Sequence, residues 1–399
     1  MSGLGVPLDA DLAWLLEVVW GGLEGVRLSG EPTAVVGAGY RVVPTLRRAR
    51  AFVPADATAA RGALRAGAGT RSRGAQRSRA LAARLAGSRL GGAAFRDRFW
   101  VIGEDPLCAA VMSAIGEGPV SFAAAVRPPS PFRKPVLQAV TPEGRVVGYA
   151  KVAWNAVTAA NVRAEHVALQ RLETAEAAAP RGPAPLALLE HRGFPVLLTR
   201  PMPEQLRRYD AQAGPPGAPV SRAVAGLAPV DAGRDPVGAR LRARFDATHA
   251  PSQPRVMVAL ADLLGGIGAR TADLPSGVWH GDWSPWNLGW VGERLWAWDW
   301  EYSRADVPVG LDLPHFIFQM RFIGQRAPVQ VAFADARSQS AAALSSLGYD
   351  AADRTVLHAA HAAEVSLRYL EAEAAGVAAN ARFLAGAVTA LRSASDALR

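Results

Sequence analysis

One polar segment constrains this chain more than any other feature. It runs from His280 to Asn287 and reads HGDWSPWN. Short apolar runs on either side are typical of strands, so the segment is predicted to be a loop between strands. The loop carries a carboxylate at Asp282 and a carboxamide at Asn287, and a second carboxylate, Asp299, follows the next predicted strand, 295–298. Three oxygen-bearing side chains near strand ends indicate a chemical site.

The order of these side chains fits the transfer of a phosphoryl group. That reaction needs a carboxylate for the acceptor hydroxyl, oxygen ligands for Mg²⁺, and a cation on the phosphates of the donor. An HxD segment with an Asn five residues after its Asp, followed by a further Asp beyond the next strands, has the order of a kinase catalytic loop and its metal-binding Asp. We therefore predict a kinase-like site at Asp282, Asn287 and Asp299.

The use of lysine points to a second part of the same machinery. The chain has 44 Lys and Arg residues, and only Lys134 and Lys151 are lysine. Kinase-like sites place a Lys on the third strand of a small sheet and pair it with a Glu in the next helix. The third predicted strand of this region, 146–152, carries Lys151, and the predicted helix 159–173 carries Glu165. Both residues are therefore predicted to bind the nucleotide.

These residues also carry a resemblance to a known family. The segment from His280 to Asn287, together with 299–303 and 310–316, resembles the aminoglycoside phosphotransferase and choline kinase superfamily over residues 120–330. The resemblance implies an α+β, bilobal protein-kinase-like fold with a small antiparallel-sheet N-lobe and a mainly helical C-lobe. It also implies that Glu301 contacts the metal or the substrate.

The resemblance implies a role for each matching residue of the loop. Asp282 is the implied catalytic base, and His280 supports the loop through a backbone hydrogen bond. Asn287 and Asp299 are the implied ligands of Mg²⁺, since both offer hard oxygen donors. Asp312 is implied to brace the same loop. The co-substrate is ATP or another nucleoside triphosphate.

The turn between the first two predicted strands departs from the family's pattern. A Gly-rich turn is expected there, because its backbone N–H groups hold phosphate. Residues 127–134 contain no Gly and three Pro, which lack an N–H group. Ser130, Arg133 and Lys134 are the side chains that can replace those donors. Thr199 lies in the segment that is implied to bind adenine.

The chain is predicted to have three parts. Residues 1–100 lie outside the resemblance and are interpreted as an accessory module, residues 101–200 as the N-lobe and residues 201–399 as the helical C-lobe. Within the first part we expect a turn at 37–39 and an Ala- and Arg-rich helix over 58–89, interrupted by glycines. The four long helices expected in the C-lobe are 311–323, 329–347, 351–375 and 378–398.

Composition excludes several classes of protein. The net charge of +9 arises mainly from the Arg-rich stretch 61–98, which has no nucleic-acid-binding motif, so we expect no specific nucleic-acid partner. Cys108 is the only cysteine, which excludes an internal disulfide. No apolar run reaches the length of a membrane span, and residues 1–20 do not have the pattern of a signal peptide. We therefore expect a cytoplasmic protein.

Three functions fit the sequence, in decreasing order. The first is a small-molecule kinase whose acceptor hydroxyl belongs to a sugar, an amino alcohol or an aminoglycoside. The second is a nucleotide-binding regulatory pseudokinase, which the missing glycines at 127–134 motivate. The third is a protein kinase, disfavoured because Trp and Glu follow Asp299. His358 and His361, three residues apart on a predicted helix, are interpreted as packing residues and not as metal ligands.

Overall fold

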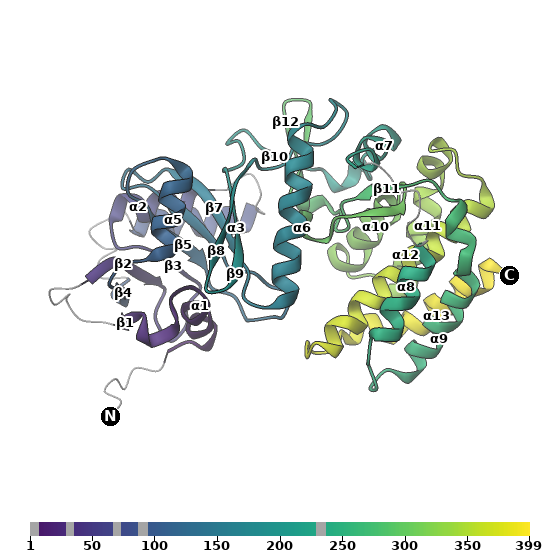
Figure 1. The fold of residues 1–399 in the computed structure, drawn as a ribbon, viewed down its shortest axis with the longest axis horizontal. Coiled ribbons are helices and arrows are strands. Elements are labelled where there is room, and N and C mark those ends of the chain that lie inside the picture. Colours follow the sequence, from purple (N-terminus) through teal and green to yellow (C-terminus); the bar gives the residue numbers. More distant parts are fainter. Residues whose placement is uncertain (1–7, 29–35, 67–72, 87–94, 229–236) are drawn as a thin grey trace. The chain divides into compact units, whose positions relative to one another are not determined.

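The computed structural model describes the chain except for residues 1–7, 29–35, 67–72, 87–94 and 229–236 (Figure 1). The chain folds into two compact units. The first contains Met1–His166 and Pro183–Leu206, and the second contains Val167–Gly182 and Arg207–Arg399. A large antiparallel sheet dominates the first unit and helices dominate the second, so the predicted α+β class is confirmed.

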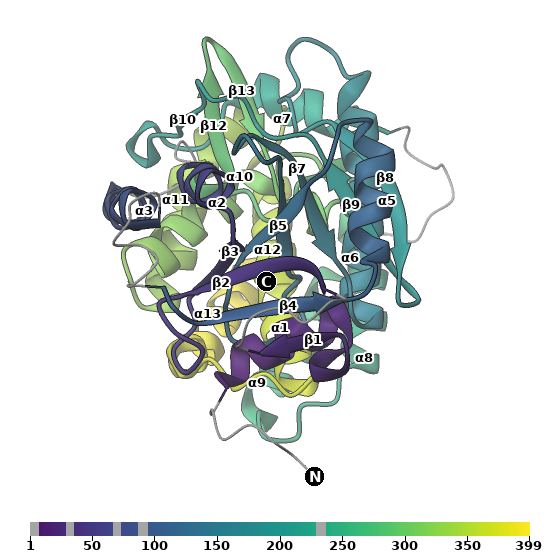
Figure 2. The same cartoon turned by 90° about the vertical axis from the view of Figure 1, so that its left-hand side faces the viewer.

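The sheet of the first unit has nine strands in the order β1-β4-β2-β3-β5-β6-β7-β9-β8. Every neighbouring pair is antiparallel, and the strands can be followed in Figure 2. Their bounds are β1 Val26–Leu28, β2 Val36–Val43, β3 Ala51–Pro54, β4 Arg98–Ile102, β5 Ser121–Ala125, β6 Val136–Val140, β7 Val146–Val152, β8 Pro185–His191 and β9 Phe194–Thr199.

The first hundred residues share this sheet with the segment that follows them. The predicted boundary at residue 100 falls inside β4, and β3 pairs with β5 through Ala51 opposite Ala125 and Phe52 opposite Ala124. Both hydrophobic clusters among the described residues of this unit contain side chains from either side of residue 100. In the described part of the chain the N-terminal segment therefore has no core of its own.

One expected turn is wrong. Residues 37–39 lie within the continuous strand β2, which pairs with β4. Glycine is needed there for close approach, since a Cβ atom on Gly39 would lie 2.2 Å from the ring of Trp100 and one on Gly37 would lie 2.6 Å from the carbonyl oxygen of Gly103.

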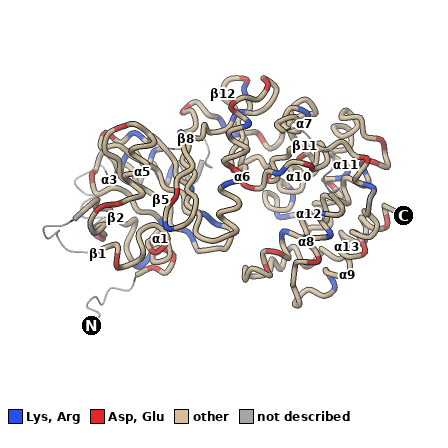
Figure 3. The backbone as a smooth tube through the Cα atoms, in the orientation of Figure 1, with Lys and Arg blue, Asp and Glu red and all other residues tan. Residues whose placement is uncertain are grey.

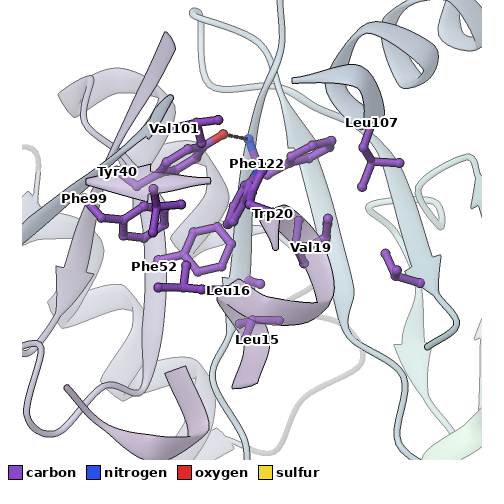
Figure 4. Packing of buried hydrophobic residues seen from close by; sticks show 14 of the residues in the cluster. Leu15, Leu16, Val19, Trp20, Tyr40, Phe52, Phe99, Val101, Leu107 and Phe122 are labelled. Atoms are coloured by element: carbon purple, nitrogen blue, oxygen red, sulfur yellow. Dashed lines mark hydrogen bonds between the residues drawn. The ribbon is translucent and has the colours of Figure 1, made fainter. Parts of the chain in front are cut away.

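Aromatic side chains fill the core of the first unit (Figure 4). Trp20 lies with its ring centroid 5.4 Å from that of Tyr40 and 5.5 Å from that of Phe52. Tyr40 stacks on Phe99 at 4.9 Å, and its hydroxyl accepts a hydrogen bond from the backbone N–H of Phe122 at 3.3 Å. Because β2, β4 and β5 each contribute a ring, this cluster joins the N-terminal strands to the rest of the sheet.

Helices of the first unit pack on this sheet. α2 contacts β3, β5 and β6, and α5 contacts β7 and β8. Asp105 caps α5 by accepting a hydrogen bond from the N–H of Cys108 at 3.0 Å, as its position before an apolar run indicates. The bounds are α1 Ala10–Trp20, α2 Ala57–Arg65, α3 Arg73–Ala86, α5 Pro106–Ile115 and α6 Ala156–Glu173, whose last residues belong to the second unit.

The second unit holds two small antiparallel sheets, β10-β12-β13 and β11-β14. Their bounds are β10 Arg207–Arg208, β11 Ser276–Trp279, β12 Leu288–Val291, β13 Arg294–Ala297 and β14 Arg304–Pro308. The helices are α7 Ala218–Ala225, α8 Val237–Ala247, α9 Pro254–Ile267, α10 Asp312–Gln319, α11 Val329–Ser346, α12 Ala351–Ala374 and α13 Ala381–Leu398. A π-helical turn, Met320–Gly324, extends α10.

The long helices α9, α12 and α13 contact one another, and α11 contacts α13 and α12 (Figure 1). Acidic and basic residues are interspersed along the described parts of both units (Figure 3). No helix in the described ranges is long and apolar enough to cross a bilayer.

Candidate active site

The predicted loop from His280 to Asn287 connects β11 to β12 in the second unit. The carboxamide Nδ2 of Asn287 donates to the carboxylate Oδ2 of Asp282 at 2.8 Å and to its backbone carbonyl at 3.0 Å. Asn287 is buried, whereas the side chain of Asp282 is 26% exposed. The loop therefore presents a fixed carboxylate to solvent. Because Nδ2 is used by Asp282, Oδ1 is the atom of Asn287 that can meet a cation.

The residue before Asp299 is hydrogen-bonded to Asn287 through the backbone. Leu288 pairs with Ala297 in the β12–β13 hairpin, and the N–H of Trp298 donates to the carbonyl of Asn287 at 3.1 Å. Asp299 has φ 62° and ψ 52°, a left-handed conformation that few non-glycine residues adopt and that Asp tolerates better than most. The hairpin thus brings the two predicted metal ligands to one end, at a position of backbone strain of the kind often found at functional sites.

His280 is fully buried beneath the loop. Its Nε2 lies 3.0 Å from the carbonyl oxygen of Trp298, and its Nδ1 accepts the N–H of Asp282 at 3.1 Å. These partners assign the proton to Nε2. Burial lowers the pKa of His280 to about 4, with Asp282 the largest opposing influence, so the ring is neutral near pH 7. The imidazole links the loop to the end of β13.

Asp312, the first residue of α10, accepts two backbone hydrogen bonds from the loop. Its Oδ2 receives the N–H of His280 at 2.7 Å and its Oδ1 the N–H of Gly281 at 3.0 Å. Burial raises the pKa of Asp312 to about 6, and these two N–H groups oppose the rise. Gly281 has φ 84°, and a Cβ there would lie 2.4 Å from the carbonyl of Tyr302, so only glycine fits the turn.

Two residues near Asp282 were missed at the sequence level. His315 Nε2 lies 3.6 Å from Asp282 Oδ1, and Gln319 Nε2 lies 3.5 Å from the same oxygen. His315 is buried, and its Nδ1 lies 3.4 Å from Nε2 of His361. His315 and Gln319 are four residues apart on α10, so they lie on one face of the helix that begins at Asp312. This spacing is the sequence pattern from which they could have been predicted.

Arg368 on α12 holds the loop from its other side. It donates from Nη1 to the carbonyl of Gly281 at 2.5 Å and from Nε to Glu364 at 2.9 Å. Its guanidinium lies 5.0 Å from the ring centroid of Trp279 and 4.7 Å from that of Tyr302. Two aromatic faces and two hydrogen bonds fix this cation. Nothing in the sequence pattern marked it.

Glu364 anchors this arginine. Burial would raise the pKa of Glu364, but Arg304, Arg368 and Arg244 outweigh burial and hold it well below its usual range. The distances from Glu364 are 2.6 Å to Arg304 and 2.5 Å to Arg244. Three guanidinium groups share this one buried carboxylate, so removal of Glu364 would leave all three without their common partner.

In the first unit, Lys151 on β7 and Glu165 on α6 form the predicted pair. Lys151 Nζ lies 2.5 Å from Glu165 Oε1, and the side chains are 13% and 0% exposed. The register of β7 opposite β6 and β9 pairs Lys151 with Val136 and Leu197 and fixes where the ammonium projects. Glu165 lies on one face of α6 fourteen residues later, at the spacing from which the pair was predicted.

The proline-rich turn between β5 and β6 is held by backbone carbonyls. Trp154 Nε1 donates to the carbonyl of Arg133 at 2.8 Å, and Asn155 Nδ2 donates to that of Pro131 at 2.9 Å. The Arg133 side chain donates to the carbonyl of Pro128 within the same turn. Ser130 accepts, through its carbonyl, the N–H of Arg133 at 2.9 Å. The turn is therefore braced from the segment after β7.

The remaining predicted residues lie at the ends of elements. Lys134 precedes β6, and Thr199 is the buried last residue of β9, opposite Tyr149 of β7. Glu301 lies half-buried in the 3₁₀ turn that follows Asp299.

The donor set of the loop fits Mg²⁺. The described residues contain no group of three or more His, Cys, Asp or Glu side chains able to hold a metal ion. Mg²⁺ is held by one or two carboxylates together with substrate phosphates and water, so it does not need such a group. Asp299 and Oδ1 of Asn287 supply hard oxygen atoms at one end of the hairpin, whereas a zinc site would need more nitrogen or sulfur ligands.

Comparisons with known proteins find relatives in structure only. No family model and no curated protein sequence matches the chain. A choline/ethanolamine kinase family protein from Mesorhizobium loti has TM-score 0.43 and 18% identity, over 71% of this chain and 92% of that one. Choline kinase LicA from Streptococcus pneumoniae has TM-score 0.43 and 14% identity, over 67% and 89%.

An aminoglycoside phosphotransferase, APH(4)-Ia, in a complex with ADP and hygromycin B has TM-score 0.46 and 12% identity, over 73% of this chain and 98% of that one. These structures carry the names of the two groups that the sequence resembles. At TM-scores below 0.5 and identities below 25% the likeness carries no argument. The function is therefore argued from the residues of this chain.

Proposed function

We propose that the chain is a Mg²⁺-dependent phosphotransferase that moves the γ-phosphate of a nucleoside triphosphate to a hydroxyl of a small molecule. One observation carries the proposal. Asp282 is a partly exposed carboxylate, fixed by Asn287, at the end of the hairpin that also carries Asp299. A base and two cation ligands in this arrangement are what phosphoryl transfer requires of a protein.

In this proposal Asp282 orients the acceptor hydroxyl and takes its proton. The hydroxyl oxygen forms a bond to the γ-phosphorus, and the bond from that phosphorus to the bridging oxygen breaks, so that the nucleoside diphosphate leaves with the electron pair. Asn287 Oδ1 and Asp299 hold Mg²⁺, which when bound neutralises charge on the phosphate oxygens. Lys151, oriented by Glu165, binds the phosphates of the donor.

The remaining residues support this chemistry. His280, Asp312 and Arg368 hold the backbone of the loop, so the carboxylate of Asp282 needs no rearrangement at the moment of reaction. Side chains of the proline-rich turn, Ser130 and Lys134, are proposed to contact the phosphates in place of glycine N–H groups.

The remaining three predicted residues have narrower proposed roles. Thr199 is proposed to contact the adenine through its backbone. Glu301 is proposed to contact the metal or the acceptor. Arg133 contributes through the shape of the turn, since its guanidinium is engaged with Pro128.

The test is nucleotide consumption with a panel of hydroxylated acceptors. Substitution of a general base lowers turnover by roughly 100- to 10,000-fold, so Asp282→Asn is expected to lose acceptor-stimulated turnover. Nucleotide affinity should stay within about threefold, since Asp282 does not contact the donor in the proposal. An Asp282→Asn variant that turns over as fast as the wild type would refute the role of this carboxylate.

A second candidate, a nucleotide-binding protein without turnover, is favoured by the proline-rich turn. Pro128, Pro129 and Pro131 lack N–H groups, and the carbonyls of Pro131 and Arg133 are already hydrogen-bonded. The two functions differ in one result. If the wild type binds Mg²⁺-nucleotide but no acceptor raises consumption above the Asp282→Asn level, the binding function replaces the catalytic one.

A further inference from the structure

A largely apolar pocket with a few polar residues lies between α11, α12 and α13, away from Asp282. Its volume is about 140 Å³. By the same measure a single water needs roughly 10–15 Å³, so the pocket can hold a ligand of several heavy atoms. The space exists because small side chains meet there: Ala334, Ala359, Ala362, Ala390, Ala394 and Ala397 line it.

The lining runs from the surface to the interior. Arg337, Thr389 and Ser393 are exposed, His358 is partly buried and His361 is buried at 1% exposure. His361 Nε2 is engaged with His315, whose other nitrogen faces Asp282. Two imidazoles therefore separate the pocket from the proposed base, and the pocket is a different site.

The charge of the lining is positive. Arg337 has no ion-pair or hydrogen-bond partner among the described residues, and no Asp or Glu belongs to the described lining. His358 Nε2 is buried and has no hydrogen-bond partner within the described ranges. A ligand with oxygen atoms could form hydrogen bonds with both the exposed guanidinium and the unsatisfied buried imidazole nitrogen of this pocket.

A metal ion is disfavoured at this site. His361 Nε2 is already engaged with His315, and Arg337 would repel a cation. Burial lowers the pKa of His358 to about 4, with Arg337 and Arg354 adding to the effect, so near pH 7 the ring is neutral and the guanidinium of Arg337 supplies the charge of the lining. Guanidinium groups bind carboxylates and phosphates through paired hydrogen bonds.

We propose that this pocket binds a small oxyanion, a phosphate or carboxylate group, between the Arg337 guanidinium and the Nε2 of His358. Thr389 and Ser393 are exposed residues of the lining, and their hydroxyls can offer further hydrogen bonds. The site is independent of the proposed transfer reaction, because none of its ligand-facing groups belongs to the Asp282 loop or to Lys151.

Histidine resonances provide a site-specific test, since the chain has only 7 His residues. Full-length protein labelled at the histidine ring is titrated with inorganic phosphate, and separately with acetate, at pH 7.5 and constant ionic strength. His358→Gln assigns the His358 signal. We expect a saturable shift of this signal with at least one anion, while exposed His249 stays unshifted as an internal control.

Matched arginine variants complete the experiment. Arg337→Gln should weaken the apparent affinity by roughly tenfold or more, because a charge-assisted hydrogen bond is lost. Arg392→Gln removes an exposed arginine of α13 that does not line the pocket and should leave the affinity unchanged. A shift with phosphate alone identifies a phosphate site, and a shift with acetate alone identifies a carboxylate site.

Three results would overturn the proposal. In the first, the His358 signal shows no saturable shift with either anion. In the second, Arg337→Gln binds the anion with the same affinity as the wild type. In the third, Arg337→Gln and Arg392→Gln weaken the affinity equally. The readout does not involve turnover, so a failure here is distinct from a failure of the proposed transferase activity. It is also blind to anion binding at a nucleotide site, because the signal belongs to His358 alone.

Discussion

Replacement of Lys151 by Met is expected to destabilise the first unit as well as to abolish nucleotide binding. Met is an unbranched apolar side chain slightly shorter than Lys, so the substitution mainly removes the ammonium charge and its N–H donors. Glu165 is fully buried, and its Oε1 lies 2.5 Å from Lys151 Nζ. Its Oε2 is buried without a hydrogen-bond partner in the described structure. The variant therefore leaves a carboxylate with no cation in a site closed to water.

The expected loss follows from this burial. Two unit charges 4 Å apart attract by about 4 kcal/mol at an effective dielectric constant of 20. Desolvation offsets most of that attraction when the pair forms, but breaking a buried pair by removing one partner costs about 3–5 kcal/mol. We expect a loss of this size for Lys151→Met. The double variant Lys151→Met with Glu165→Leu should recover most of it, because no buried charge remains.

Hydrogen exchange in increasing urea measures the loss of stability in the first unit separately from the second. Peptides from β7 and α6 report the free energy of opening of the first unit, and peptides from α12 serve as an internal control in the second. Calorimetric titration with Mg²⁺-nucleotide should show no binding in either variant. If Lys151→Met opens within about 1 kcal/mol of the wild type, or if the double variant is no more stable than the single one, the ion-pair reasoning is refuted.

Three further predictions concern the loop. Asp312→Ala leaves the N–H groups of His280 and Gly281 unsatisfied, which should lower the free energy of unfolding of the second unit in urea by about 2–6 kcal/mol. A loss below about 1 kcal/mol would contradict the role of Asp312 in holding the loop. The pKa of His280 is about 4 in the folded protein and 6.5 in the unfolded chain. The contribution of the neutral ring to stability is therefore present above pH 6.5 and is lost as the pH falls toward 4. A His280→Gln variant whose stability depends on acid pH as the wild type's does would contradict this. His315→Leu should lower kcat roughly tenfold or more with little change in the KM for nucleotide, whereas a change in KM alone would speak against a positioning role at Asp282.

Local sequence patterns predicted those strands and helices that have a clear apolar periodicity of their own. The strands β7 and β13 and the helices α10, α11, α12 and α13 lie within a few residues of the ranges predicted for them. Their apolar periodicity and turn residues are local properties of the sequence. The same is true of the Lys151–Glu165 pair, whose spacing follows from a strand and the next helix.

Features that depend on distant contacts were not predictable in this way. β14 is short, and it exists because its Val307 pairs with Gly277 of β11, thirty residues away. The segment 200–246 is rich in Gly and Pro, which favour loops, yet it contains α7 and most of α8. Gly39 indicated a turn, but the ring of Trp100 requires glycine at that position of the strand. In each case tertiary packing outweighed local preference.

The residues of the candidate site also divide into those predictable from local sequence and those that depend on distant contacts. Asp282 and Asn287 could be placed from sequence because they share one short loop. Arg368 could not, since it reaches Gly281 from α12. Its partner Glu364 also pairs with Arg244 and Arg304, which come from two other segments. Buried ion networks of this kind leave no periodic pattern in the chain.

The central claim is most directly tested by following the γ-phosphate itself. Wild type and Asp282→Asn are incubated with Mg²⁺ and nucleoside triphosphate labelled in the γ-phosphate, in the presence of pooled sugars, amino alcohols and aminoglycosides. We expect a labelled, acceptor-dependent phosphate ester with the wild type and at least about 100-fold less with the variant. Label found only in inorganic phosphate, or an ester formed equally by both proteins, would contradict it.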